Sequence, residues 1–178
     1  MENNFKIKAK IGEVFKLGKY ELIRLGNEQG GVAVLCKDIL FKSRFGNNNV
    51  FSQSEIFRRL NAEILPEMEA LVGAENVLEF TTDLLSVDGS EKHGAFRSKI
   101  SLPTFDFYRA NRAILEQYKP DGWWWLATPW ETSEYTDDDW IACVSPRGDF
   151  SHDDVNFGNL GVRPFLVFSS SIFESCEN

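Results

Sequence analysis

The sequence predicts a single domain of the α+β class, and three observations support that prediction. The chain has 178 residues, enough for one domain with a sizeable hydrophobic core. Strand-like apolar runs stand near both ends, and amphipathic helical patterns stand between them. No internal repeat and no linker-like stretch divides the chain. We therefore expect residues 1–178 to form one domain, with residues 174–178 as a flexible tail.

The first quarter of the chain favours strands. Residues 15–41 contain apolar and alternating runs that predict two or three of them. GNEQGG, residues 26–31, predicts a turn between strands. VAVLC, residues 32–36, is a short continuous apolar run and is expected to be a buried strand, with Cys36 as a small core residue.

Two helices are predicted in the middle of the chain. The first lies in SQSEIFRRLNAEILPEME, residues 52–69, where Ser52 or Ser54 can cap the start and Pro66 should end or kink the helix. The second is TFDFYRANRAILEQY, residues 104–118, with Thr104 as its N-cap. Apolar residues recur at helical spacing in both segments, so each helix should bury one face.

The tryptophan-rich segment WWWLATPW, residues 123–130, begins a return to strands. Alternation places Trp123 and Trp125 on one face of a strand and Trp124 on the other. Both faces are then apolar, as in a central strand covered on both sides. We expect all three tryptophans to be core residues, and Cys143 in WIACV to lie in a second buried strand.

Aromatic and acidic residues gather in the loops that follow. ETSEYTDDDW, residues 131–140, is too polar to be core, and aromatic rings beside acids suit a carbohydrate, a cationic peptide or a basic protein surface. Alternatively, Trp130 and Trp140 anchor a long loop from beneath. The loops of residues 130–140 and 145–160 are the expected working surface. The candidate binding residues are Trp130, Tyr135, Asp137, Asp138, Asp139, Trp140, His152, Asp153 and Asp154.

The acidic residues raise the question of a metal. Calcium would need six to eight oxygens from several segments, and Asp137–Asp139 lack the spacing of a calcium loop. Asp153 and Asp154 would add oxygens if the two loops converged. Solvated charge is the simpler interpretation, so no metal and no cofactor are expected.

The segment GVRP, residues 161–164, is expected to have a structural role. Arg163 stands between Gly161 and Pro164 at the entry to a terminal apolar strand. Such a cation commonly donates to loop carbonyls or to a buried carboxylate and stacks on a tryptophan. PRGD, residues 146–149, is interpreted as a hairpin turn.

Charge and composition exclude several classes of function. The net charge of the whole chain is −8, and residues 104–178 carry thirteen acidic and five basic side chains. This surface should repel nucleic acid and anionic membranes and attract a basic protein surface. No apolar run reaches membrane-spanning length, and the N-terminal segment lacks a signal-peptide pattern, so a cytoplasmic location is expected. Three cysteines without metal spacing, and two histidines, assemble no recognisable catalytic set.

Four segments, in this order, carry a resemblance to a known family: SEIFRRLN (54–61), WWWLATPW (123–130), WIACVSPRGDF (140–150) and GVRPFLVF (161–168). They resemble the DUF6273 family, a bacterial and phage domain of unknown function, over residues 12–173. Ala127 stands where that family usually has Arg, so the role of that side chain is not carried over. The resemblance implies a C-type-lectin-like fold. In such a fold the N- and C-terminal strands pair, two main helices flank a mostly antiparallel sheet, and the second half is rich in loops.

The expected function is a non-enzymatic binding or interaction module of bacterial or phage origin. A protein partner with a basic surface is favoured over carbohydrate. Two alternatives stay open. One is an acidic phage-encoded inhibitor that occupies the basic groove of a nucleic-acid-binding protein, and the other is an enzyme of unrecognised type. The oligomeric state does not follow from the sequence.

Overall fold

The computed structural model describes residues 6–132 and 139–175, and in them the chain is α+β, as predicted. Most of the strands pair antiparallel. The strands are β1 (Val14–Leu17), β2 (Tyr20–Glu28), β3 (Gly31–Cys36), β4 (Phe41–Ser43), β5 (Phe80–Asp83), β6 (Ala95–Ser98), β7 (Trp124–Pro129), β8 (Trp140–Val144), β9 (Phe150–Asp154), β10 (Leu160–Val162) and β11 (Phe165–Phe168). The α-helices are α1 (Glu55–Arg59), α2 (Leu65–Val72), α3 (Phe105–Ala110) and α4 (Arg112–Leu115).

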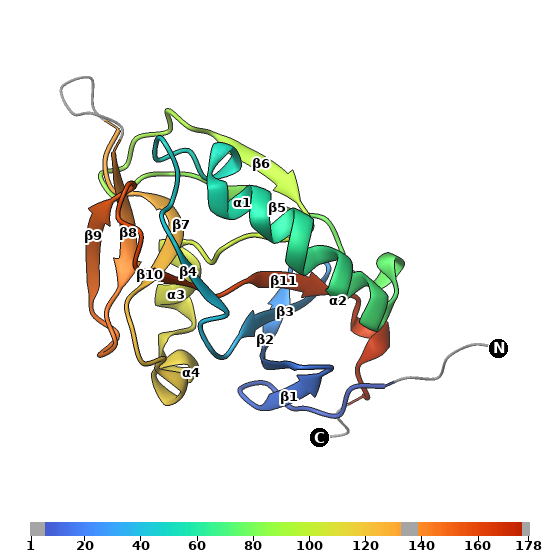
Figure 1. Ribbon diagram of the computed structural model, residues 1–178. Helices are drawn as coiled ribbons and strands as arrows, with labels where there is room; N and C mark the ends of the chain where they lie inside the picture. Colours follow the sequence, from blue (N-terminus) through green and yellow to red (C-terminus); the bar gives the residue numbers. More distant parts are fainter. Residues whose placement is uncertain (1–5, 133–138, 176–178) are drawn as a thin grey trace.

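The first sheet joins the two ends of the chain. Its strand order is β1-β2-β3-β11, and β11 pairs antiparallel with β3 so that Val167 faces Ala33. A parallel bridge between Ile7 and Phe173 continues this closure beyond the sheet. The expectation that the terminal strands share one sheet is confirmed for Phe165–Phe168, the red strand beside the blue ones in Figure 1.

The second sheet carries the tryptophan-rich strand. Its strand order is β4-β10-β7-β8-β9. Strand β10 runs parallel to β7, and all other neighbouring strands of this sheet are antiparallel. Strands β5 and β6 form a separate two-stranded ribbon. Val162 belongs to the second sheet, so the GVRP segment is where the chain crosses from one sheet to the other.

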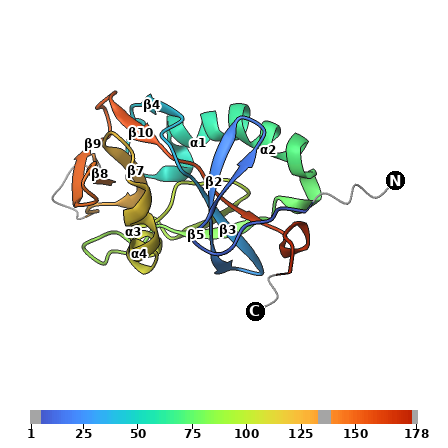
Figure 2. The same cartoon turned by 90° about the horizontal axis from the view of Figure 1, so that it is seen from below.

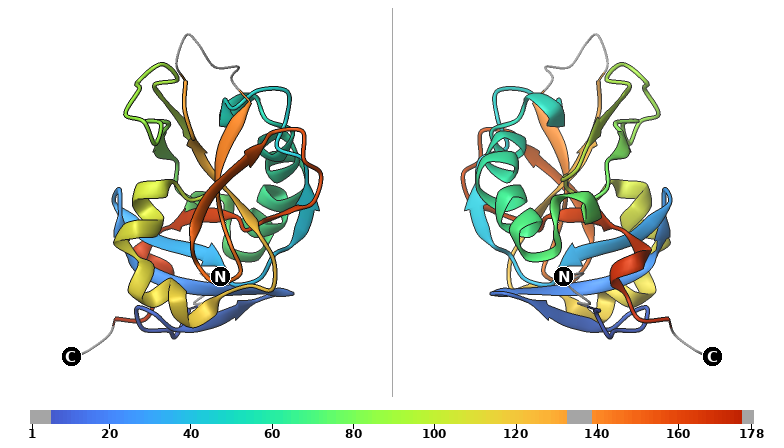
Figure 3. Two further views of the ribbon diagram at one scale, coloured as in Figure 1. Left: turned by 90° about the vertical axis from the view of Figure 1, so that its left-hand side faces the viewer. Right: turned by 90° about the vertical axis from the view of Figure 1, so that its right-hand side faces the viewer.

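Helices cover both faces of the sheets. The helical stretch from Glu55 to Val72 packs on one side, and α3 with α4 packs on the opposite side (Figures 2 and 3). Because both faces are covered, all six residues of β7 are buried. Its side chains divide between two apolar clusters, with Trp125 in one and Trp124 in the other.

The first helix does not end at Pro66. It passes through a wider π turn at Leu60–Ile64, in which the Leu65 amide donates to the Leu60 carbonyl five residues earlier. Proline lacks an amide hydrogen and clashes with the carbonyl four residues back, and a wider turn relieves both problems. Pro66 then stands in the first turn of α2, where no intrahelical amide is needed. Gly73, with φ 89°, ends the helix.

The predicted caps and the second helix are present, with one interruption. The side chains of Ser54 and Thr104 accept from the amides three residues on, at the starts of α1 and α3. The second helix is divided at Asn111, whose side chain donates to the Phe107 carbonyl. This local hydrogen bond competes with regular helix geometry.

The prediction that Trp123 is a core residue is wrong. Its side chain is 44% exposed, whereas Trp124 and Trp125 are 1% and 0% exposed. Trp123 precedes β7, and only its carbonyl takes part in the sheet, accepting from the Gly161 amide at 2.7 Å. Alternation would place it on the face of Trp125, but the position lies outside both apolar clusters.

Candidate functional site

The structure brings three of the predicted binding residues together. The His152 ring lies between Trp130, 4.5 Å away by ring centroids, and Trp140, 4.7 Å away. Trp140 and His152 project from neighbouring strands on the same side as Ala142, because residues of one face alternate along a strand. Trp140 is 37% exposed and Trp130 is half-buried against the core. We call Trp130, Trp140 and His152 the aromatic cluster.

The predicted acidic residues do not form one group in the described part of the chain. Tyr135, Asp137 and Asp138 lie outside the described residues. The backbone of Asp139 joins the start of β8 to the segment after β9, since its carbonyl accepts a hydrogen bond from the Val155 amide at 2.8 Å. Among residues 6–132 and 139–175, no three His, Cys, Asp or Glu side chains gather closely enough to hold a metal.

The two acids after His152 stabilise a turn. Asp153 accepts from the Asp154 amide at 2.8 Å, and Asp154 accepts from the Asn156 amide at 2.8 Å. Such short side-chain-to-backbone bonds are typical of Asp in turns. These carboxylates shape the chain after β9 and keep negative charge near the aromatic cluster.

Arg163 is buried and makes contacts of the kind predicted for a structural cation. It is 1% exposed, its Nε donates to the Cys36 carbonyl at 3.0 Å, and its guanidinium lies 4.6 Å from the Trp124 ring. Burial lowers the pKa of Arg163 to about 10, so the side chain is still charged at neutral pH. Pro164 contributes its carbonyl to the Cys36 amide, and a Cβ on Gly161 would lie 2.5 Å from Ile39. The GVRP segment therefore connects the two sheets through hydrogen bonds and close packing.

Neither described cysteine suits nucleophilic chemistry. Cys36 and Cys143 are 0% and 1% exposed, and burial raises the pKa of each thiol to about 12. A thiol that stays protonated at physiological pH is a poor nucleophile. Both residues serve as small core side chains, as predicted.

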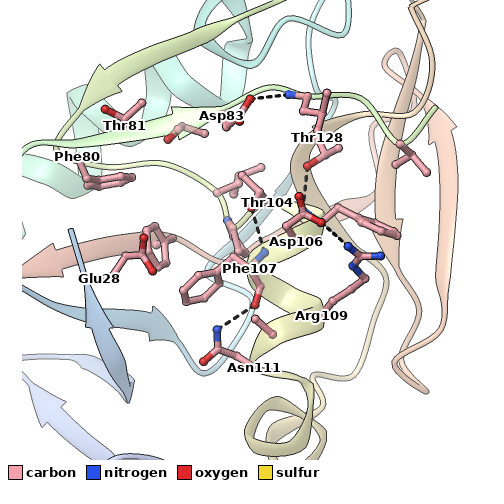
Figure 4. A pocket seen from close by; sticks show the side chains of 18 of the residues that line it. Glu28, Phe80, Thr81, Asp83, Thr104, Asp106, Phe107, Arg109, Asn111 and Thr128 are labelled. Atoms are coloured by element: carbon pink, nitrogen blue, oxygen red, sulfur yellow. Dashed lines mark hydrogen bonds and ion pairs between the residues drawn. The ribbon is translucent and has the colours of Figure 1, made fainter. Parts of the chain in front are cut away.

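A pocket of about 550 Å³ lies between α3 and β5, and it is not among the sites predicted from the sequence. In Figure 4, Phe80, Thr81 and Asp83 border one side, and the other side is bordered by Thr104, the N-cap of α3, and by Asp106 and Phe107 of that helix. Thr128 of β7 lies at one end and Glu28, from the end of β2, lies toward the other. Segments from five parts of the chain thus meet around one cavity.

The floor of the pocket is aromatic. The Phe165 ring contacts Phe80 at 5.1 Å and Phe107 at 4.6 Å between centroids, both edge to face. Phe80 and Phe165 are almost completely buried and are held by these ring contacts. An apolar floor with polar groups around it is the usual form of a binding site.

The rim of the pocket carries excess negative charge. Glu28, Asp83 and Asp106 lie along it, against the single guanidinium of Arg109. Arg109 is paired with Asp106 at 2.6 Å, and both side chains are largely exposed. Two carboxylates therefore stand at the rim without a cation among the pocket-lining residues. A ligand with Lys or Arg side chains would find complementary charge here.

The pocket and the aromatic cluster are neighbours. The connection after β5 borders the pocket, and its Val87 amide donates to the Pro129 carbonyl at 2.9 Å. The next amide, of Asp88, donates to the Trp130 carbonyl at 3.3 Å. Phe105, at the pocket, also stacks on Phe150 of β9 at 4.2 Å. The two features therefore form adjoining parts of one face.

Comparisons with known proteins add no relative. No family model, no curated protein and no solved structure matches the chain. Among the helices of the described part of the chain, none is both long and apolar enough to cross a membrane. The geometry of the site is therefore the basis for a proposed function.

Proposed function

We propose that this chain is a non-enzymatic binding domain that takes an Arg- or Lys-containing segment of a partner protein into the α3–β5 pocket. The observation that carries the proposal is the combination of an aromatic floor with a rim of three carboxylates and one arginine. The floor suits an apolar or aliphatic part of the ligand, and the rim suits its charges.

The aromatic cluster extends this surface. Trp130, Trp140 and His152 offer ring faces and edges beside the carboxylates of Asp153 and Asp154. Partly exposed tryptophans next to negative charge are common contact points for cationic side chains. A partner segment longer than the pocket would continue across the cluster.

The C-type-lectin-like assignment and membership of the DUF6273 family belong to the same proposal. The shared sheet of the terminal strands and the helices on both sides support the coarse outline of such a scaffold. In this interpretation the scaffold is held by the GVRP segment and Trp124, while the ligand is bound at the loops and the edge of β5.

The test is direct binding of defined probes. Fluorescein-labelled heptapeptides that alternate Val with Lys, with Glu or with Ser would be titrated by fluorescence anisotropy at low and high salt. We expect only the Lys peptide to bind, and we expect about tenfold weaker binding at 0.5 M than at 0.05 M salt. A neutral glucose oligomer serves as the carbohydrate probe.

Matched variants locate the site. Asp83→Asn together with Asp106→Asn removes two rim charges while keeping the oxygen that accepts from the Leu85 amide. Asp121→Asn together with Glu174→Gln removes the same charge from exposed positions outside the pocket lining. The rim variant should bind the Lys peptide about tenfold more weakly, and the control should bind as the wild type does. Equal losses in both, or salt-independent binding of the glucose oligomer alone, would contradict the proposal.

A further inference from the structure

One side of β5 is covered by a side chain instead of by a strand. The Nε2 of Gln29 donates to the Thr81 carbonyl at 2.8 Å, and the Thr81 amide donates to the Oε1 of Gln29 at 2.7 Å. A neighbouring strand would satisfy the same two backbone groups in the same way. The side-chain amide of Gln29 therefore makes the two hydrogen bonds that one residue of a neighbouring strand would make.

The direction of the backbone bonds in β5 follows from its pairing with β6. In an antiparallel pair, alternate residues exchange hydrogen bonds with the partner strand. The Leu84 amide donates to the Gly94 carbonyl, so even-numbered residues point toward β6 and its turn. Thr81 points the other way, toward Gln29, and Asp83 must present its backbone amide and carbonyl on that same outer side. Both residues line the pocket.

The position of Gln29 is unusual for its residue type. Gln29 and Gly30 form the two-residue turn between Glu28 and Gly31, with φ of 43° and 87°. Positive φ at both positions defines a type I′ hairpin turn, in which Asn, Asp or Gly is favoured at the first position. Among the residues that the structure describes, Gln29 is the one non-glycine residue with positive φ. The side chain that reaches Thr81 is thus held on a turn that would favour a shorter one.

We infer that the outer edge of β5 is a docking edge for an extended basic peptide, which adds a strand there after displacing the side chain of Gln29. The inference rests on the proposed function and specifies how the ligand binds. A strand edge facing a helix across an aromatic floor is a geometry that recognises extended peptides through their backbone. Side chains of such a peptide would alternate between the phenylalanine floor and the carboxylates of Glu28, Asp83 and Asp106.

The first experiment examines the edge without ligand. Gln29→Asn keeps a residue that favours the turn but shortens the side chain by one methylene, so the amide no longer reaches Thr81. Hydrogen exchange of the Thr81 amide, followed by NMR, should become at least about tenfold faster in this variant. Gln117→Asn, the same change at an exposed position in another part of the chain, should leave it unaltered.

The second experiment measures binding of the Val/Lys heptapeptide. In the Gln29→Asn variant the side-chain amide no longer competes with the peptide for the edge of β5. This variant should therefore bind the Val/Lys heptapeptide about fivefold more tightly than the wild type, which corresponds to about one hydrogen bond. N-methylation of the peptide at one alternating set of residues should abolish binding, and N-methylation at the other set should be tolerated, since only one set faces the strand.

The outcomes separate the two proposals. If no basic peptide binds the wild type or any variant, the proposed function fails and this inference fails with it. If the peptide binds but both N-methylated sets bind alike, or Gln29→Asn binds no better than Gln117→Asn, the docking edge alone is refuted. The inference is equally refuted if Gln29→Asn dimerises in analytical ultracentrifugation and the peptide does not dissociate the dimer, because the edge then serves a second copy.

Discussion

The two buried tryptophans of β7 should respond differently to the same substitution. Trp125 donates its indole N–H to the Ser43 carbonyl at 2.9 Å and packs edge to face on Phe45. The indole N–H of Trp124, equally buried, has no acceptor among the described residues. Its ring instead lies under the guanidinium of Arg163 and beside Tyr108. Trp→Phe keeps a ring at each site but removes the N–H.

The expected cost differs by one hydrogen bond. Loss of ring atoms costs about 1–2 kcal/mol at either site, since part of the volume becomes a cavity. At Trp125 the buried Ser43 carbonyl also loses a donor, which adds about 1–3 kcal/mol. We therefore expect Trp125→Phe to destabilise by about 2–4 kcal/mol and Trp124→Phe by about 1–2 kcal/mol. Either Trp→Ala change should cost about 3–5 kcal/mol.

Urea unfolding followed by circular dichroism measures these differences, provided the slope of the transition stays constant between variants. The Trp123→Phe variant is the matched control, because that side chain is 44% exposed and should change stability by less than about 0.5 kcal/mol. If Trp124→Phe costs as much as Trp125→Phe, the hydrogen bond to Ser43 does not contribute as argued.

Three further predictions concern other parts of the fold. Gly31→Ala should lower the free energy of unfolding by about 1–3 kcal/mol or more, because a Cβ there would lie 2.5 Å from the Phe168 carbonyl oxygen. Gly26 has open space around it, so Gly26→Ala should be near neutral in the same unfolding assay. A salt bridge from Lys19 and a hydrogen bond from Tyr20 hold the pKa of Glu67 below the usual value of a glutamate. Their stabilising effect is therefore present above that usual pKa and is lost as the pH falls through the lowered one. The stability difference between wild type and Glu67→Gln should accordingly disappear in acid, and a difference that persists at pH 2 would contradict this. In a Cys176→Ser background, Cys36 and Cys143 should resist a thiol-specific dye at pH 8 until the protein is unfolded, and labelling of the folded protein would show that one of them is accessible.

The parts of the fold predicted correctly are those determined by short stretches of sequence. Ser54 and Thr104 cap their helices because a side-chain oxygen needs only an amide three residues on. The core position of Trp124 and Trp125 follows from alternation within one strand. Alternation wrongly predicts a core position for Trp123, because it does not show where a strand begins, and that boundary depends on the neighbouring strands of the sheet.

The candidate site was only partly predictable for a related reason. The aromatic character of Trp130 and Trp140 is visible in the sequence, and the acids beside them identify a polar loop. That His152 would lie between these two rings depends on the register of β8 and β9, which the sequence does not state. The PRGD turn, by contrast, was predictable, because Ser145 and Gly148 shape it locally.

The pocket shows why local patterns do not reveal a site made from distant segments. Thr104 is recognisable as a helix cap and Gln29 as part of a turn, and in the folded protein each of them does fill that local role. Their second role, as walls of one cavity, arises only when α3 and the β2–β3 turn meet at β5. The contact between Gln29 and Thr81 joins residues 52 positions apart, and nothing near either residue requires it. Gln29 occupies a turn position that favours asparagine. Its longer side chain reaches across the pocket to a strand edge that would otherwise be open.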